Sequence, residues 1–413
     1  MYKFVMIPEV YPRSFQLEPT DPFLETLQAL PPKATAFCCG GAFAKANGRL
    51  LDTLRKQKRT VEVDSLESLG PECLVVSSFF NKFSPTEKFE QVRASGAKIL
   101  YYLDYTEENG YVPDKNEYFI YSSEAQLFSC MANGQFSLDS SGRAEAGRME
   151  EGGEGVAVGL LRPHDITKGR DEPREILRRK LAEAMGLEFN PDRLLAVHFT
   201  NHNLDSAAVE RGLMRLAEHC DILIKHHETR EEAIVKLEGP GIFNYYSHYG
   251  SVNHHLSYLA RYAADVALIG CFSGAAPTTL MMGTKMIPVF TQKVFATGKA
   301  REAGAYSSFS TEMRNPFRVV TLKISDCLPP VSLEATEMLW ERINDAAYWE
   351  RYKAELSSIQ KAALGSFLLG PAALKRAQAF IVRLMQNGSF FAPGTNKLVM
   401  IRPLLSVNVG NPL

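Results

Sequence analysis

Several classes of protein are excluded by what this sequence lacks. The 413 residues include seven cysteines, an odd number, with no Cys-x-x-Cys pair among them, so neither a disulfide framework nor a zinc site is expected. No apolar run approaches the roughly 18 residues of a membrane-spanning helix. The amino-terminal segment also lacks the apolar core of a secretory signal. We therefore expect a folded cytoplasmic protein, with any membrane contact peripheral and at the inner face.

The chain also lacks an excess of charge of either sign. Lys and Arg together number 46 and Asp and Glu 47, which gives a formal net charge of −1. Such a chain has no global positive field to gather nucleic acid, so any anionic ligand must be held by a local site. The composition, 45% hydrophobic and 23% charged, is that of a globular protein. Its length predicts two or three domains.

Short apolar strands alternate with amphipathic helices in the first part of the chain. Helices are indicated between the strands, for example at 44–57 and 86–95, by apolar residues at three- and four-residue spacing. Repeated strand–helix alternation predicts an α/β fold with a mostly parallel sheet. The expected strands are Tyr2–Ile7, Ala34–Cys39, Thr60–Val63, Cys73–Ser77, Lys98–Leu103 and Tyr118–Tyr121.

A second series of strands and helices follows a polar stretch at 134–155. This stretch has no periodic apolar face and predicts an exposed loop. The expected elements beyond it are the strands Val156–Leu160, Leu194–Phe199, Ile222–Lys225, Gly241–Tyr245, Val266–Ile269 and Met286–Phe290, and the helices Glu172–Met185, Asp205–Glu218, His254–Tyr262 and Ala276–Met282.

The two series predict two facing Rossmann-like domains. They join near residue 160, so we expect an N-terminal domain at 1–155 and a second domain at 156–330. A cleft between two such domains is the default ligand site. Residues 333–385 predict two or three helices, which would form a C-terminal helical tail at 331–413.

The most informative motif is the small-residue turn Gly270–Gly274 between the strand Val266–Ile269 and the next helix. Such a turn leaves backbone N–H groups unpaired and aims them, with the helix dipole, at one point, which suits a phosphate. Ser273 adds a hydroxyl, and Gly274 lets a ligand approach the backbone. We expect Ser273, Gly274 and Ala275 to bind a phosphate. The alternative is a tight turn that binds nothing.

All nine histidines lie between His164 and His255. Two basic groups, Lys225 and His227, follow a strand at its carboxyl end and share one face if the strand continues. A cation with an imidazole can neutralise a phosphate and protonate a departing phosphate oxygen. The alternative is a polar loop. Adjacent histidines rarely converge on one metal, so we expect no metal ion here.

The N-terminal domain offers carboxylates on one loop. Asp104, Glu107 and Glu108 follow the strand Lys98–Leu103 at its carboxyl end, facing the expected cleft. One of them could act as the general base that deprotonates a hydroxyl group. The alternative is an ordinary solvated acidic loop.

A basic pair lies near the expected domain crossing. Arg162 and His164 would both sit close to the cleft, and Asp165 could orient the imidazole of His164 or cap a turn. The structural interpretation is a rigid hinge set by Pro163. The two interpretations are compatible.

With these residues, the second half resembles the nucleotide-binding half of GT-B type transferases. The families it is similar to are bacterial CDP-glycerol glycerophosphotransferases and surface-polysaccharide transferases that use CMP-activated sialic acid or Kdo. Gly159–Asp165 looks like their strand followed by Gly-x-Pro-Arg-x-Asp, and Lys225–His227 looks like their Lys-x-His-Pro, with His227 as the matching imidazole. Ala264–Gly274 is similar to their Ala-Asp, strand and Ser-Ser turn. The resemblance covers 156–295.

The resemblance implies a transferase that moves a glycosyl or polyol-phosphate group from a nucleotide-activated donor, with cytidine as the base, to a glycan or polyol hydroxyl in surface glycan biosynthesis. It implies that Ser273 and Gly274 bind the donor phosphate and that Lys225 and His227 stabilise the leaving phosphate. The stretch Glu107–Gly110 looks like the acidic motif that carries the base in bacterial sialyltransferases. No cofactor and no nucleic-acid partner is implied.

The sequence departs from these motifs at several points. Arg162 and Pro163 stand in reversed order, Glu228 replaces the proline, and Cys271 replaces an Asp that precedes the Ser-Ser pair. These changes keep the features expected to bind a phosphate but leave the identity of the donor undecided. Two alternatives follow: a UDP-N-acetylhexosamine 2-epimerase, and a non-catalytic scaffold that binds nucleotide-sugars. One scaffold hosts many chemistries, so the fold does not decide among them.

Overall fold

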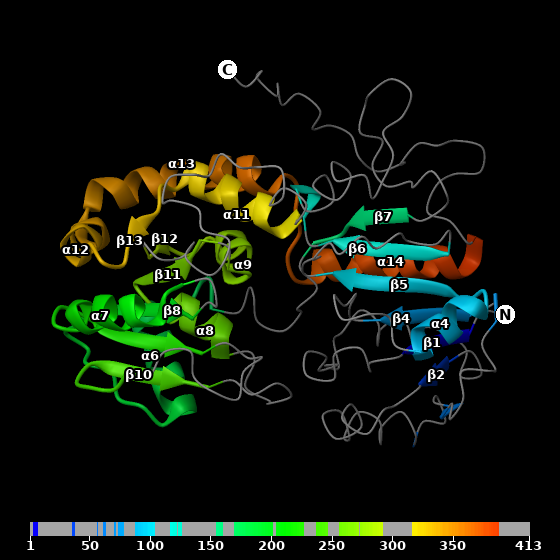
Figure 1. Cartoon of the computed structure of the whole chain (residues 1–413), viewed down its shortest axis with the longest axis horizontal. Coiled ribbons are helices and arrows are strands. Elements are labelled where there is room, and N and C mark those ends of the chain that lie inside the picture. The colour runs from blue at the N-terminus through cyan, green and yellow to red at the C-terminus, as the bar shows by residue number, and fades with distance from the viewer. Residues whose placement is uncertain are drawn as a thin grey trace.

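The computed structural model contains two separate β-sheets, each built from parallel strands and flanked by helices (Figure 1). This arrangement confirms the α/β fold expected from the sequence. The structure describes residues 3–6, 35–37, 56, 61–62, 70–71, 73–77, 87–103, 116–121, 123–125, 154–159, 169–200, 204–226, 237–246, 256–271, 273–291 and 316–387. Within these residues, no helix is both long enough and apolar enough to cross a membrane.

The first sheet has seven strands in the order β3-β2-β1-β4-β5-β6-β7. All six strands expected before residue 122 are present in it, because apolar runs such as Leu74 in β4 and Ile99 and Leu100 in β5 form its buried centre. Helix α4 (Glu87–Ala94) leads into β5. The strands are β1 (Lys3–Met6), β2 (Thr35–Phe37), β3 (Val61–Glu62), β4 (Cys73–Ser77), β5 (Lys98–Leu103), β6 (Glu117–Tyr121) and β7 (Glu154–Ala157).

Strand β7 differs from its expected place. The sequence predicted a strand at Val156–Leu160 that opens the second series, but β7 begins at Glu154 and pairs with β6 at the edge of the first sheet. That expectation is wrong about the sheet to which the strand belongs. The strand ends early because Gly159 adopts φ +107°, a left-handed conformation that breaks an extended strand.

The second sheet has six strands in the order β10-β9-β8-β11-β12-β13. The strand order reverses between β8 and β11, which makes their carboxyl ends the switch point where open α/β sheets bind ligands. Because crossovers between parallel strands are right-handed, this reversal puts α7 on one face of the sheet and α8 and α9 on the other. The strands are β8 (Leu195–Phe199), β9 (Asp221–Lys225), β10 (Ile242–Tyr245), β11 (Val266–Gly270), β12 (Met286–Phe290) and β13 (Val331–Ser332).

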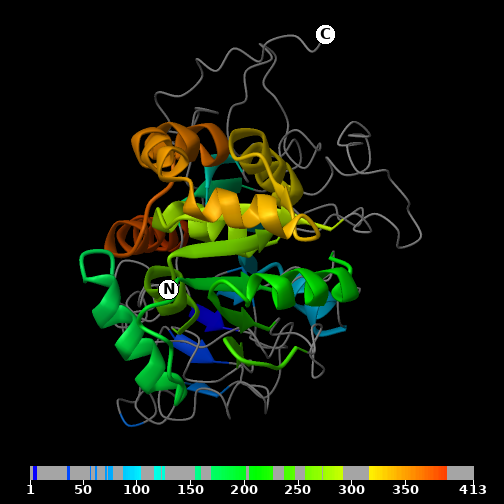
Figure 2. The same ribbon diagram turned by 90° about the vertical axis from the view of Figure 1, so that its left-hand side faces the viewer.

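The helices of this part confirm the expected series and add one element. Helix α6 packs against α8 (Figure 2). An additional helix, α11, and the short strand β13 were not expected from the sequence. The helices are α6 (Arg174–Met185), α7 (Ser206–Leu216), α8 (Leu256–Ala263), α9 (Ala275–Met282) and α11 (Pro316–Cys327).

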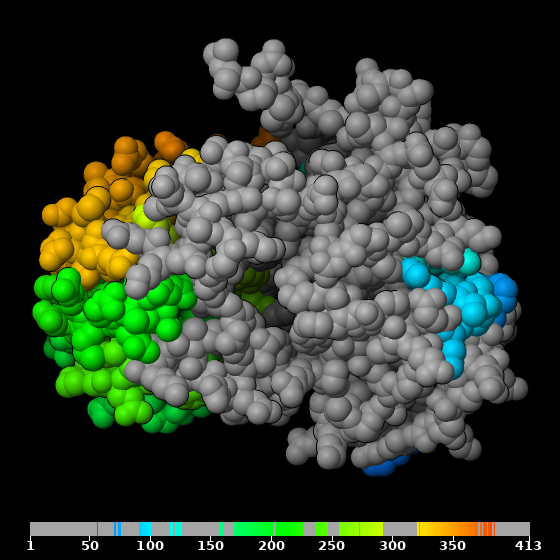
Figure 3. All heavy atoms as spheres, in the orientation of Figure 1, coloured from blue at the N-terminus to red at the C-terminus, as the bar shows by residue number. Residues whose placement is uncertain are grey.

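Three helices follow β13 and return the chain to the first sheet. Helix α12 lies beside α7 on the surface (Figure 3). Helix α13 is tied to the end of α9 where Gln360 Nε2 donates to the carbonyl of Leu280 at 2.7 Å. Helix α14 lies along the first sheet (Figure 1), and Lys98 Nζ in β5 donates to the carbonyl of Leu384 at 3.3 Å. These helices are α12 (Thr336–Asn344), α13 (Ala346–Leu364) and α14 (Pro371–Asn387).

The connector between α13 and α14, residues 365–370, docks at the carboxyl end of the first sheet. Glu124, a buried residue beyond β6, donates its N–H to the Ser366 carbonyl at 3.1 Å, and its Oε2 accepts the Ser366 N–H at 2.9 Å. A Cβ on Gly159 would lie 2.5 Å from the carbonyl oxygen of Leu368. The connector therefore sits too close to Gly159 for any side chain there.

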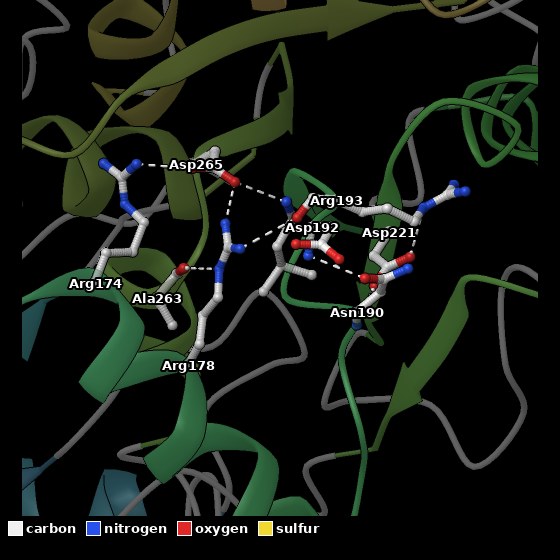
Figure 4. A network of polar contacts seen from close by, with 9 residues as sticks. Arg174, Arg178, Asn190, Asp192, Arg193, Asp221, Ala263 and Asp265 are labelled. Atoms are coloured by element: carbon white, nitrogen blue, oxygen red, sulfur yellow. Dashed lines mark hydrogen bonds and ion pairs between the residues drawn. The ribbon is translucent and has the colours of Figure 1, made fainter.

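A carboxylate fixes the amino-terminal edge of the second sheet (Figure 4). Asp265 precedes β11 and accepts hydrogen bonds from Arg174 Nη1 and the Leu195 N–H, both at 2.7 Å, and from Arg178 Nη2. Arg178 also donates to two backbone carbonyls. This network joins helix α6 to two central strands, so the Asp of the Ala264-Asp265 motif lies at the sheet edge opposite the switch point.

Candidate functional site

The candidate site is the carboxyl-terminal edge of the second sheet, where polar groups from five strands gather. Because the strands are parallel, the residues that follow them meet at this single edge. They are Thr200 after β8, Lys225 and His226 at the end of β9, Tyr246 after β10, the Gly270–Gly274 turn after β11, and Thr291 after β12.

In the turn after β11, more backbone N–H groups are hydrogen-bonded within the turn itself than the sequence predicted. Ser273 N–H donates to the Gly270 carbonyl, and Ala276 N–H donates to the Ser273 carbonyl, both at 3.0 Å. Ala275 N–H donates to Ser273 Oγ at 3.3 Å. Among residues 273–276, only the N–H of Gly274 has no acceptor from the described part of the chain. A phosphate here would meet that N–H and the hydroxyl proton that Ser273 retains.

A buried arginine lies beneath the first turn of α9. Arg261 of α8 is 5% exposed, and its Nε donates to Thr279 Oγ1 at 2.8 Å. Thr279 Oγ1 in turn donates to the Ala275 carbonyl at 2.7 Å, which links the guanidinium to the start of α9. The guanidinium carbon lies 4.1 Å from the ring centroid of Phe199. This fixed positive charge adds to the positive end of the α9 dipole.

Arg261 is not among the site residues expected from the sequence. Its only signal was a charged residue in a segment, Leu256–Ala263, that is otherwise largely apolar. A lone arginine on such a helix more often reaches solvent along its aliphatic stem.

Lys225 lies on the same face of the sheet as Arg261. It ends β9, is 8% exposed, and stands in register with Phe199 of β8 and Tyr245 of β10. Since side chains alternate along a strand, Lys225 and Phe199 point to one face, the face that Arg261 covers. The carbonyl of Lys225 accepts a hydrogen bond from the N–H of Thr200 at 3.0 Å, which continues the hydrogen-bond ladder between β8 and β9 past the end of β8. Two cations thus lie on the face that α8 and α9 cover.

The next residue, His226, belongs to the opposite face. It is 3% exposed, and its Nε2 lies 2.7 Å from Oδ1 of Asn244. Asn244 Nδ2 donates to the Leu237 carbonyl at 2.9 Å, so its oxygen must accept, and the proton of the His226 ring is assigned to Nε2. Burial lowers the pKa of His226, and the nearby Lys225 ammonium lowers it further. The ring is therefore neutral, with Nδ1 as an acceptor.

Another neutral histidine lies deeper on the same face as His226. His198 in β8 is fully buried, and its Nδ1 lies 3.2 Å from the carbonyl oxygen of Leu268. Burial lowers the pKa of His198 to about 4. Its Nε2 has no hydrogen-bond partner among the described residues. His198 is enclosed in the sheet core, so its role is structural. Protonation of this buried ring at low pH would destabilise the fold.

The site residues expected from the sequence divide into two groups. Ser273, Gly274, Ala275 and Lys225 are described, and the fold brings them to the same sheet edge. Within the described residues, no three His, Cys, Asp or Glu side chains cluster as metal ligands would. The expected residues that lie outside the described part of the chain are His227, Asp104, Glu107, Glu108, Arg162 and His164.

The chain is similar in structure to enzymes of several kinds, while no family model and no curated protein matches its sequence. Against the wall teichoic acid polymerase TagF it is 11% identical, covering 94% of this chain and 89% of that chain with a TM-score of 0.49. Against the UDP-GlcNAc 2-epimerase of Neisseria meningitidis it is 10% identical, covering 92% of this chain and 98% of that chain with a TM-score of 0.44. Against the glycosyltransferase SnogD of Streptomyces nogalater it is 13% identical, covering 93% of this chain and 99% of that chain with a TM-score of 0.44.

Proposed function

We propose that this chain is a GT-B type transferase that moves a glycosyl or polyol-phosphate group from a nucleotide-activated donor to a hydroxyl acceptor. The observation that carries the proposal is the meeting of Ser273, the Gly274 N–H, Arg261 and Lys225 at one edge of the second sheet. A helix N-terminus with two buried cations at the switch point of a parallel sheet favours an anion with several oxygens, such as a donor phosphate.

The proposed reaction needs positioning and charge balance more than covalent chemistry. The acceptor oxygen forms a bond to the transferred group as the bond to the donor phosphate breaks, and the electron pair leaves with the phosphate oxygen. Lys225 would balance the growing negative charge, and His227 would protonate the leaving oxygen. The acceptor proton would pass to a carboxylate, for which the candidates are Asp104, Glu107 and Glu108.

The proposal includes a division of labour along the chain. Residues 1–155 would form the acceptor-side domain and 156–330 the donor domain, with Arg162 and His164 near the cleft between them. The tail at 331–413 would join the two, which the docking of its connector against Glu124 supports. We further propose a cytidine donor, a surface-glycan acceptor and a site of action in the cytoplasm at the inner face of the membrane.

The test is nucleotide binding by calorimetry, with CDP, UDP, GDP and ADP on the whole chain. Ser273→Trp places a bulky ring in the turn and is expected to abolish binding of whichever nucleotide binds. Ser273→Ala removes one hydroxyl and is expected to weaken binding about 2- to 10-fold. Met338→Trp, at an exposed position of α12 away from this edge, is the matched control and should bind as the wild type does. Unchanged binding in Ser273→Trp would refute the placement of the phosphate.

Turnover then separates the alternatives. A transferase releases nucleotide from the activated donor at a rate that depends on a hydroxyl acceptor. An epimerase interconverts UDP-N-acetylhexosamines with no acceptor present. A scaffold binds the nucleotide and turns nothing over. Only the first result supports the proposed function.

A further inference from the structure

We propose that Thr279 is a positioning residue of the donor-phosphate site. Its hydroxyl couples the buried Arg261 guanidinium to the first turn of α9 and so holds the phosphate-binding groups of the Gly270–Gly274 turn in place before the ligand arrives. This inference rests on the proposed function, because it takes that turn to hold the donor phosphate. Thr279 is fully buried, so it acts through α9 and not by touching the ligand. It lies beyond the sequence motifs.

The first observation is a directed chain of hydrogen bonds, the Arg261–Thr279–Ala275 relay. Arg261 Nε donates to Thr279 Oγ1 at 2.8 Å, and Thr279 Oγ1 donates to the Ala275 carbonyl at 2.7 Å. A guanidinium has only donors, so the single hydroxyl proton of Thr279 is directed at Ala275. A charged donor also polarises the hydroxyl that accepts from it and strengthens the next bond. The carbonyl that begins α9 is therefore held more firmly than a threonine alone would hold it.

The second observation is that the guanidinium is itself held in place. Arg261 Nη1 donates to the Ser257 carbonyl at 2.8 Å and to Ser257 Oγ at 3.2 Å, one turn earlier in α8. Its guanidinium carbon lies 4.1 Å from the ring centroid of Phe199 at the end of β8. Apolar side chains would join α8 and α9 at a lower cost, because a buried charge gives up its hydration. An anion beyond the turn gives this costly charge a purpose.

The third observation is that Ala275 joins the relay to the proposed binding groups. Its carbonyl accepts from Thr279, and its N–H donates to Ser273 Oγ at 3.3 Å. Three consecutive hydrogen bonds therefore run from the guanidinium to the hydroxyl that would meet the phosphate. Breaking the middle one frees the first turn of α9 while the helix and its dipole remain.

The experiment measures the affinity of the whole chain for inorganic pyrophosphate, CDP, UDP, GDP and ADP by calorimetry, well below the melting temperature. Thr279→Val keeps the shape of the side chain and removes the hydroxyl, and it is expected to weaken binding of pyrophosphate about 2- to 10-fold. Thr279→Ser keeps the hydroxyl and should bind within about twofold of the wild type.

The matched control is Thr284→Val, which makes the same chemical change at the far end of α9. Thr284 Oγ1 donates to the Thr279 carbonyl at 3.5 Å and takes no part in the relay. This variant should bind pyrophosphate as the wild type does. Thr279→Cys has nearly the shape of Thr279→Ser but carries a weak hydrogen-bonding group, so it should bind more weakly than the serine variant even if the valine variant does not fold.

The melting temperature separates positioning from packing. Thr279→Val is expected to melt below the wild type, because Arg261 Nε loses its acceptor. If Thr279 only packs α9 against α8, the folded valine variant binds pyrophosphate as tightly as the wild type, and the positioning role is refuted. Equal affinities of Thr279→Ser and Thr279→Cys would also refute it, since the hydroxyl would then make no difference.

Binding by the wild type separates this inference from the one on which it rests. If the wild type binds neither pyrophosphate nor any of the nucleotides, the phosphate site and the positioning role fail together. If the wild type binds and Ser273→Trp does not, the phosphate site stands. The variants at Thr279 then decide the positioning role alone.

Discussion

Replacing Asp265 with alanine tests how the second sheet is held at its amino-terminal edge. The carboxylate accepts hydrogen bonds from Arg174, Arg178 and the Leu195 N–H. The alanine variant would leave the Leu195 N–H and the Arg178 Nη2 without this acceptor in a largely buried place, since the side chains of Asp265 and Arg178 are 14% and 16% exposed.

The expected loss follows from that burial. Removing one partner of a buried ion pair costs ~3–5 kcal/mol, because the other charge stays buried without compensation. For a unit of this size, each kcal/mol shifts the melting temperature by a few degrees, so the shift should be about 6 to 20 °C. The partner variant Arg174→Ala is expected to lose about 1 kcal/mol or less, because that side chain is 41% exposed and its pair is screened by water.

Thermal unfolding followed by circular dichroism measures both variants beside the wild type. Nucleotide affinity below the melting temperature provides a second measurement. Asp265 and the candidate site lie at opposite ends of β11, whose five residues span about 16 Å, so the affinity of the folded variant should not change. An Asp265→Ala variant that loses less than about 1 kcal/mol would show that the carboxylate does not hold the sheet.

Two further predictions concern stability. Burial in the folded chain lowers the pKa of His198 from 6.5 to about 4. Between these two values the unfolded chain binds a proton that the folded chain does not, so the free energy of unfolding falls as the pH drops through this window, by about 3 kcal/mol. Denaturant unfolding at pH 7 and pH 4.5 should show a smaller loss for His198→Leu than for the wild type, and equal losses would contradict this. Gly159→Ala places a Cβ 2.5 Å from the Leu368 carbonyl oxygen and 2.9 Å from Ala373 Cβ at φ +107°, so it should destabilise the first sheet by more than about 1 kcal/mol, and an unchanged melting temperature would argue against the docking of the connector.

Most strands of this fold could be predicted from the sequence because each is a short apolar run between polar segments, whereas β13, with only two residues, gives no such signal. Helix α11 could not, since its stretch Val319-Val320-Thr321 favours a strand locally and tertiary contacts override such a preference. The strand with which β7 pairs, β6, could also not be predicted from the sequence. Pairing is decided by contacts between distant segments, and local alternation carries no information about which sheet accepts a strand.

The candidate site was predictable where a local motif carries it. Ser273 and Gly274 follow a buried strand, and that pattern alone places them at a sheet edge. Arg261 and the His226–Asn244–Tyr246 group depend on register between strands and on the crossing of α8 over β8, which no local pattern encodes. For the same reason, the local motif points to His227 and not to its neighbour His226. The structure adds His226 because Nδ1 of its buried ring has no hydrogen-bond partner among the described residues.

The return of α14 to the first sheet has a consequence for the order in which the protein folds. The contact between Lys98 and Leu384 joins residues 286 positions apart, so the first sheet is covered by a segment that is synthesised long after its own strands. Contacts of such long range form slowly, because the intervening chain must close a large loop. During synthesis the second sheet can acquire its helices in sequence. The first sheet keeps the apolar surface that α14 later covers exposed until that helix has been made. That interval is when the nascent chain is most exposed to aggregation and most in need of a chaperone.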